Sequence, residues 1–222
     1  MIEIRDREGK LLYRHTEGEQ SMSAALEAAC EDHVNLSGAV LDGLDLSETS
    51  FEHAALTGAS FREANLRGCN FEHSRLDGAS FERADLTGSC LEHSSLRASL
   101  FTSAQLRSVS FEGCQLDDAV LSAAIGQGAN FEGCSLRGAD LSLAQLTGAS
   151  FEHAQLVRAN LRGAALQRCN FEHVDASDAA FDEADLTDTN FEHALLEGAT
   201  LKGCKLEGAH FEGATGLSKT YA

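Results

Sequence analysis

All twelve phenylalanines of this 222-residue chain are separated from one another by multiples of five residues. When the chain is read in blocks of five, the central position holds Leu or Phe in 34 of 36 consecutive blocks, from Leu36 to Phe211. The position two residues earlier is Ala in 21 blocks and Cys in five, and it is never charged. Every block therefore points one large and one small apolar side chain inward, and the chain must turn a corner every five residues. A helical period of 3.6 residues cannot produce this pattern.

Glycine and glutamate mark how these blocks are arranged. Sixteen of the 20 glycines lie two residues after a block centre. A type II turn needs a positive φ at its third residue, which glycine adopts without steric cost. Phe-Glu-His or Phe-Glu-Gly also recurs every 20 residues from Phe51 to Phe211, with Leu91-Glu92-His93 filling one gap. This longer period predicts four blocks per coil.

Individual blocks identify a family. Ala64-Asn65-Leu66-Arg67-Gly68, Ala84-Asp85-Leu86-Thr87-Gly88 and Ala139-Asp140-Leu141-Ser142-Leu143 resemble the A(D/N)LXX motif of pentapeptide-repeat proteins. The resemblance covers about four fifths of the chain. It implies an all-β fold, a right-handed quadrilateral parallel β-helix of about nine coils. At a strand spacing of ~4.8 Å the rod would be roughly 43 Å long.

The two ends depart from the repeat. Residues 1–33 are predicted to form an N-terminal cap, residues 34–215 the β-helix and residues 216–222 a C-terminal tail. In the cap, Ile2 to Arg14 alternate like a β-hairpin with a turn near Arg7 to Lys10, and Ser21 to His33 read as a short helix. A separate recognition module is the alternative to a cap. The tail offers no capping helix, so the last coil is open to an end-to-end homodimer.

Composition limits the functional classes. The formal net charge of −18 disfavours direct contact with nucleic acid or anionic membranes and favours basic partners. No uncharged apolar stretch is long enough to span a bilayer, and the first residues lack the apolar core of a signal peptide, so we expect a cytoplasmic protein. Seven cysteines without a CxxC argue against a disulfide framework or zinc ribbon. We find no catalytic motif and expect neither an enzyme nor a cofactor.

The first candidate binding feature is a ladder of glutamates, one after each block centre on a single side of the rod. Stacked coils would place them ~4.8 Å apart, a charge density comparable to one per ~3.4 Å along a DNA strand. The alternative is a solvated face that keeps the rod soluble. The ladder consists of Glu52, Glu72, Glu92, Glu112, Glu132, Glu152, Glu172, Glu192 and Glu212.

The second candidate is a ladder of histidines beside the glutamates. Glycine replaces histidine in the remaining coils of this side, so the turn geometry alone could explain these residues. The alternative functions are pH sensing and binding of a divalent metal, although a repeated ladder defines no closed ligand set. The histidines are His53, His73, His93, His153, His173 and His193.

These observations predict a rigid, non-enzymatic acidic scaffold that binds an unidentified protein. The family includes quinolone-resistance proteins that mimic DNA, so the resemblance implies an alternative: a ligand of DNA gyrase or another type II topoisomerase that inhibits or protects it. This chain differs from several of those proteins because it has no inserted loops and no recognisable C-terminal dimerisation module. A Glu/His ladder that senses pH or binds metal is the third alternative.

One block breaks the pattern in a way that the structure can resolve. Gly126 occupies a central position where Leu is expected, with Ile125 beside it. We expect either that Ile125 turns inward or that a void remains.

Overall fold

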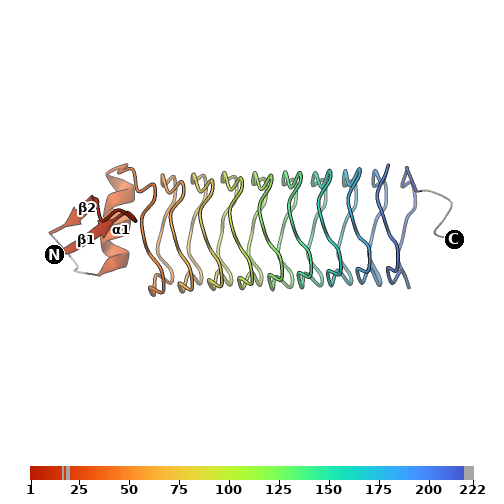
Figure 1. Ribbon diagram of the computed structural model, residues 1–222, viewed down its shortest axis with the longest axis horizontal. Helices are drawn as coiled ribbons and strands as arrows, with labels where there is room; N and C mark the ends of the chain where they lie inside the picture. The colour runs from red at the N-terminus through yellow and green to blue at the C-terminus, as the bar shows by residue number, and fades with distance from the viewer. Residues whose placement is uncertain (17, 19–20, 218–222) are drawn as a thin grey trace.

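The protein is a straight rod with a small cap at its N-terminal end, as the computed structural model shows for residues 1–16, 18 and 21–217 (Figure 1). Strand β1 (Ile2–Arg5) pairs antiparallel with β2 (Leu11–His15), and helix α1 (Met22–Glu31) follows. The predicted hairpin-plus-helix cap is therefore confirmed. The rest of the described chain winds into stacked coils.

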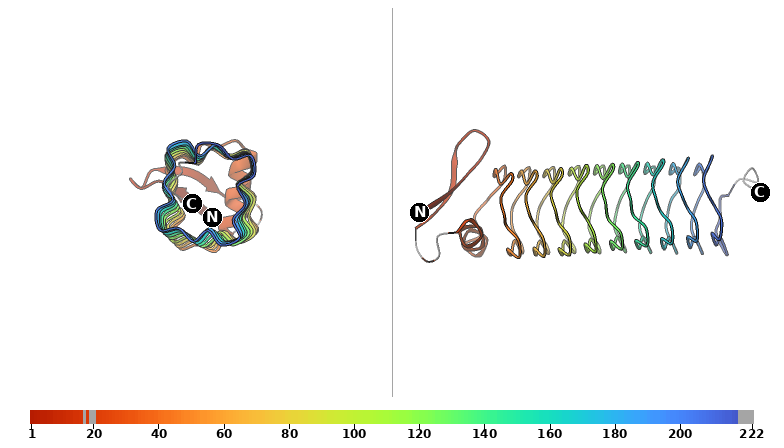
Figure 2. Two further views of the ribbon diagram at one scale, coloured as in Figure 1. Left: turned by 90° about the vertical axis from the view of Figure 1, so that its right-hand side faces the viewer. Right: turned by 90° about the horizontal axis from the view of Figure 1, so that it is seen from below.

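Each coil contains four blocks. The outward residue of each block pairs in parallel with the residue 20 positions later, from Asn35 with Ala55 to Leu195 with Thr215. Viewed along the axis, the coils form a square whose corners nearly overlie one another (Figure 2). This confirms the four blocks per coil that the repeat predicted and the right-handed quadrilateral β-helix that the resemblance to pentapeptide-repeat proteins implied.

The corners are turns of one kind. In every block except that of Leu41, the N–H group three residues after the centre donates to the carbonyl of the centre, as Ala54 N does to Phe51 O at 3.0 Å. The residue two after the centre has a φ between 54° and 75° in all 36 blocks, although it is glycine in only 16 of them. The turn conformation is therefore imposed by the coil, and residues other than glycine accept its cost.

The core is built from stacked identical side chains. Phe131, Phe151 and Phe171 are fully buried, and their rings stack with centroids 4.9 Å apart and planes within 6° of parallel. Where phenylalanines occupy opposite sides of a coil, as Phe51 and Phe61 do, the rings meet edge to face at 5.8 Å. Both geometries are favourable for aromatic pairs.

The small inward position also carries hydrogen bonds. Cys114 Sγ donates to Leu91 O at 2.8 Å, and Ser74 Oγ donates to Phe51 O at 2.6 Å. Cysteine therefore does more here than fill space, because its thiol ties one coil to the preceding one. All seven cysteines are free. Burial raises the pKa of the Cys169 thiol to about 12.

The block at Gly126 follows neither expectation. Its coil is regular, with Gly126 N donating to Gln145 O at 2.8 Å, and Ile125 keeps its outward, partly buried ladder position. A Cβ atom at position 126 would lie 2.9 Å from Leu146 Cδ2 and 3.3 Å from Leu106 Cβ. The leucines of the two neighbouring coils therefore lean into the space that a side chain at 126 would occupy.

The cap covers the first coil. Leu26 and Ala29 of α1 are fully buried in the common core, and Val40 N donates to Arg5 O at 3.0 Å. At the other end, Thr215 is the last bridged residue in the described part of the chain. Of the predicted tail, residues 218–222 lie outside the described part of the structure. The described residues include no helix that is long and apolar enough to cross a bilayer.

Candidate acidic binding face

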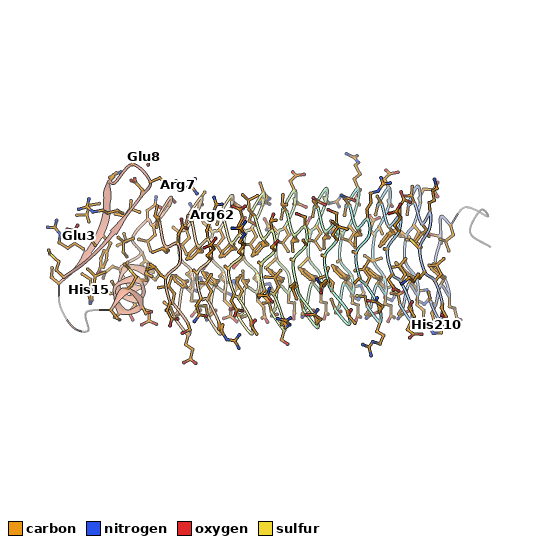
Figure 3. All side chains as sticks on the ribbon, turned by 60° about the horizontal axis from the view of Figure 1, so that its bottom comes forward. Glu3, Arg7, Glu8, His15, Arg62 and His210 are labelled. Atoms are coloured by element: carbon orange, nitrogen blue, oxygen red, sulfur yellow. The ribbon has the colours of Figure 1, made fainter. Side chains whose placement is uncertain are left out.

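The predicted glutamates occupy one side of the rod, each at the first turn position after a block centre. Parallel pairing of residues 20 apart places one on every coil. The phenylalanines behind them stack at 4.6–5.1 Å, which sets the rise between successive glutamates. We call these nine residues, Glu52 to Glu212, the glutamate face. Side chains cover the whole outside of the rod, with His210 close to its C-terminal end (Figure 3).

Four of the nine glutamates, Glu72, Glu92, Glu112 and Glu152, accept a hydrogen bond from the following coil. Glu92 accepts a hydrogen bond from Ser110 Oγ at 2.8 Å, and Glu152 accepts one from Asn170 Nδ2 at 3.1 Å. Apart from Glu52 and Glu212 at the two ends, the glutamates are only partly exposed. Sequence reasoning missed this restraint, although the Ser or Asn that precedes many of the phenylalanines was its signal. These four carboxylates are therefore oriented along the rod.

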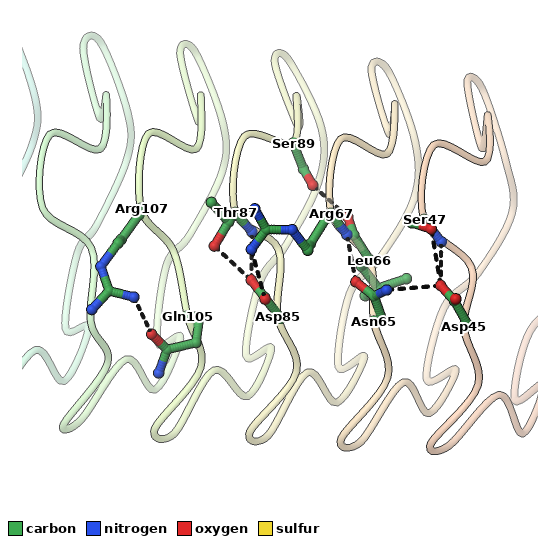
Figure 4. Close-up of polar contacts among 10 residues, drawn as sticks. All are labelled: Asp45, Ser47, Asn65, Leu66, Arg67, Asp85, Thr87, Ser89, Gln105 and Arg107. Atoms are coloured by element: carbon green, nitrogen blue, oxygen red, sulfur yellow. Dashed lines mark hydrogen bonds and ion pairs between the residues drawn. The ribbon is translucent and has the colours of Figure 1, made fainter.

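The charge of this face is not neutralised by Lys or Arg. Neither basic residue occurs at its two turn positions, where only Glu, His and Gly are found. Elsewhere, acids are paired along the rod: Arg62 lies 3.3 Å from Glu82, and Arg67 lies 3.1 Å from Asp85. Figure 4 shows such a corner, where Arg67 reaches Asp85 and Thr87 donates to the same carboxylate. The acidic excess is therefore concentrated on one side.

The six predicted histidines lie beside the glutamates as two separate stacks. All six are exposed and have φ values between 56° and 59°, the conformation that their turns require. His53 and His73 stack at 5.2 Å, and His173 and His193 stack at 5.0 Å. Gly113 and Gly133 separate the two stacks. Within the glutamate face, three of the imidazoles approach a neighbouring carboxylate at 3.5–3.7 Å.

This geometry does not favour a metal site. Parallel rings 5 Å apart cannot share an ion, because Zn–N bonds are only about 2.0–2.1 Å long. Among the described residues, the group whose ligand atoms all lie within 4.8 Å of one another is Glu72, Cys90 and Glu92, without a histidine. Burial raises the pKa of the Cys90 thiol to about 12, which disfavours the thiolate that would bind a metal.

The glutamate face begins at a cleft between the cap and the first coil. The cleft has a volume of about 350 Å³. Side chains from the end of α1 form one wall, and the first glutamate and histidine of the ladders form the other. It is lined by Glu27, Cys30, Glu31, His33, Ser50, Glu52 and His53.

The fold and this face define a solenoid repeat protein whose surface is an ordered array of side chains. Family models for pentapeptide repeats match residues 44–121 and, in overlapping segments, residues 104–215. The chain belongs to the pentapeptide repeat family. A search of curated protein sequences found no match.

Several solved structures are similar. One is HetL, a pentapeptide repeat protein involved in heterocyst differentiation regulation in the cyanobacterium Nostoc. It is 26% identical in sequence, and the match covers 90% of this chain and 97% of HetL with a TM-score of 0.35. QnrB1, a plasmid-mediated fluoroquinolone resistance protein, is 18% identical, with 79% and 92% covered at a TM-score of 0.34.

Proposed function

We propose that this protein is a non-enzymatic scaffold whose glutamate face binds a basic surface of another protein. The observation that supports the proposal is the concentration of nine glutamates on one side, without a Lys or Arg at either turn position. A face kept only for solubility needs no such restriction, because charges distributed over four sides would serve equally well. Carboxylates held by the next coil also lose less side-chain freedom when a partner binds.

The specific partner that we propose is the DNA-binding surface of a type II topoisomerase such as gyrase. One carboxylate per coil, about 4.8 Å apart, approaches the charge density of a DNA strand, which carries one charge per ~3.4 Å. Such a protein would act in the cytoplasm without binding nucleic acid or membrane itself, since both are anionic. The proposal would place the rod in a groove that normally receives DNA.

Inhibition of gyrase supercoiling tests this proposal. The wild type should inhibit at micromolar concentration, and inhibition should weaken steeply with salt because it rests on exposed charge. A variant with Glu92, Glu112, Glu132 and Glu152 changed to Gln should lose inhibition.

The matched control removes the same number of charges from the other sides of the rod. It carries Asp118→Asn, Asp178→Asn, Asp188→Asn and Glu197→Gln, four exposed residues, and should inhibit like the wild type. Equal loss in both variants would show that net charge matters rather than the glutamate face. Absence of inhibition by the wild type would exclude the topoisomerase and leave a scaffold for another basic partner.

A further inference from the structure

A different side of the rod carries charges in an antisymmetric order. Its first turn positions, one per coil, bear the signs −, +, −, then three neutral residues, then +, −, +. Reading this series from the opposite end reverses every sign. The residues are Asp42, Arg62, Glu82, Thr102, Ser122, Ser142, Arg162, Asp182 and Lys202. We call this series the antisymmetric ladder.

The outward ladder of the same blocks lies against it, since Ser60 Oγ donates to Asp42 and Ser80 Oγ donates to Glu82. This ladder carries a single charge and consists of Val40, Ser60, Ser80, Leu100, Val120, Asp140, Asn160, Ala180 and Thr200. The three turn residues from Thr102 to Ser142 give the antisymmetric ladder a neutral centre. Beside this neutral centre, Leu143 is 66% exposed and has a φ of 59°. A bulky exposed residue in the left-handed region carries a conformational cost, so this part of the surface is unusual in a chain of such high charge.

We propose that this side binds a second copy of the chain, with the two rods side by side and antiparallel. A two-fold axis that lies across the ladder at Ser122 maps the coils onto one another in reverse order. Asp42 of one copy then faces Lys202 of the other, Arg62 faces Asp182, and Glu82 faces Arg162. Since the symmetry doubles each contact, six opposite-charge pairs form across the interface.

Ion pairs within each chain strengthen this complementarity. Arg62 lies 3.3 Å from Glu82, and Arg162 lies 3.1 Å from Asp182. In the dimer, the Arg62–Glu82 pair of one copy would face the Arg162–Asp182 pair of the other. Each of these charges would then have two neighbours of opposite sign, one in its own chain and one in the partner. Figure 3 shows Arg62 on the outside of the rod. A parallel arrangement would instead place each charge opposite its own copy.

One kind of like-charge contact, formed twice because of the symmetry, accompanies this arrangement along the turn positions of this side. Glu63 would face Glu183, and Glu63 is already paired with Arg83 in its own chain at 3.1 Å. The glutamate face cannot associate in this way, because every rung would meet another carboxylate. The neutral centre therefore supplies the place where two chains of net charge −18 can approach one another.

The expected affinity is low. A contact roughly 43 Å long and roughly 10 Å wide buries about 430 Å² of each copy. Interfaces of this size are at the weak end of specific association. Sedimentation experiments should therefore extend to several hundred micromolar protein.

Charge exchange tests the pairing. Arg162→Glu alone and Glu82→Arg alone should each weaken the dimer about tenfold in analytical ultracentrifugation, and the double variant should recover it. These residues lie well inside the rod, so contacts between rod ends would not couple them. A wild type that stays monomeric at several hundred micromolar would overturn the proposal. So would a dimer that neither single variant weakens, which would indicate the end-to-end contact instead.

A cysteine on the symmetry axis tests the register. Ser122→Cys should form a cross-linked dimer with a short bismaleimide, because residue 122 meets its own copy there. Ser177→Cys, at an equivalent turn position on another side with similar burial, should cross-link no more than the wild type. Equal cross-linking of both variants, or none by Ser122→Cys, would refute the antiparallel register.

Discussion

Replacing Phe151 with Ala tests the energetic basis of the rod. The ring is fully buried and stacks on Phe131 and Phe171, each at 4.9 Å. Truncating a buried Phe costs about 3–5 kcal/mol, and the loss of two aromatic stacks places this site toward the upper end of that range. Because each coil is supported only by its neighbours, little of this loss can be recovered by rearrangement elsewhere.

Denaturant unfolding followed by circular dichroism measures the effect. Glu152→Ala, one residue away, is the matched control, and it should cost only about 1 kcal/mol through loss of the hydrogen bond from Asn170. Phe151→Leu should fall between the two, since leucine is the commonest central residue. Similar losses for Phe151→Ala and Glu152→Ala would refute the assignment of the inward phase.

Three further predictions concern single positions. Gly126→Leu should lower the free energy of unfolding by about 1–3 kcal/mol through overpacking against Leu146. Gly126→Ala should cost less, because its Cβ atom would displace the flexible Leu146 Cδ2 methyl at 2.9 Å and press on Leu106 Cβ at 3.3 Å. Thermal melts of both variants decide this, and a stabilising leucine would reveal an unfilled void. Because the pKa of the Cys169 thiol is raised in the folded state, the folded state retains the thiol proton between about pH 8.5 and 12 while the unfolded state loses it, so the free energy of unfolding should fall by up to about 1.4 kcal/mol per pH unit in that range. Cys169→Ala should reduce this dependence of the unfolding free energy on pH, measured by urea titrations at alkaline pH. An unchanged dependence would contradict the buried thiol. Ser21→Ala should lower the free energy of unfolding by about 1 kcal/mol, because the Ser21 side chain accepts a hydrogen bond from Ala24 N at the start of α1. Hydrogen exchange should show faster exchange of the cap amides in this variant, and unchanged protection would argue against this role.

The sequence was sufficient to predict the coil because the five-residue pattern directly identifies the side chains that form the core. The invariant spacing of phenylalanines determined which side chains face inward, and the recurrence of Glu every 20 residues determined four blocks per coil. The hairpin and helix of the cap were also predictable from alternation and from helix-forming residues. Short-range patterns of this kind need no knowledge of long-range contacts.

What the sequence did not reveal depends on side-chain placement between coils. Predicting that Glu152 is held by Asn170 requires knowing which way the glutamate leans along the rod. The occupancy of the space at Gly126 likewise depends on the rotamer of Leu146, which the repeat pattern does not specify. The function of the glutamate and histidine ladders remains a prediction, since their geometry limits the chemistry but names no partner.

The arrangement of four blocks per coil restricts how such a gene can change in length. Inserting five residues would keep every downstream core side chain inward but would rotate all later sides by a quarter turn. The glutamates before and after the insertion would then lie on adjacent sides, and the antisymmetric ladder would be divided in the same way. Only duplications or deletions of 20 residues lengthen or shorten the rod while leaving each surface continuous. Natural length variants of this chain should therefore differ by whole coils wherever a surface ladder is under selection.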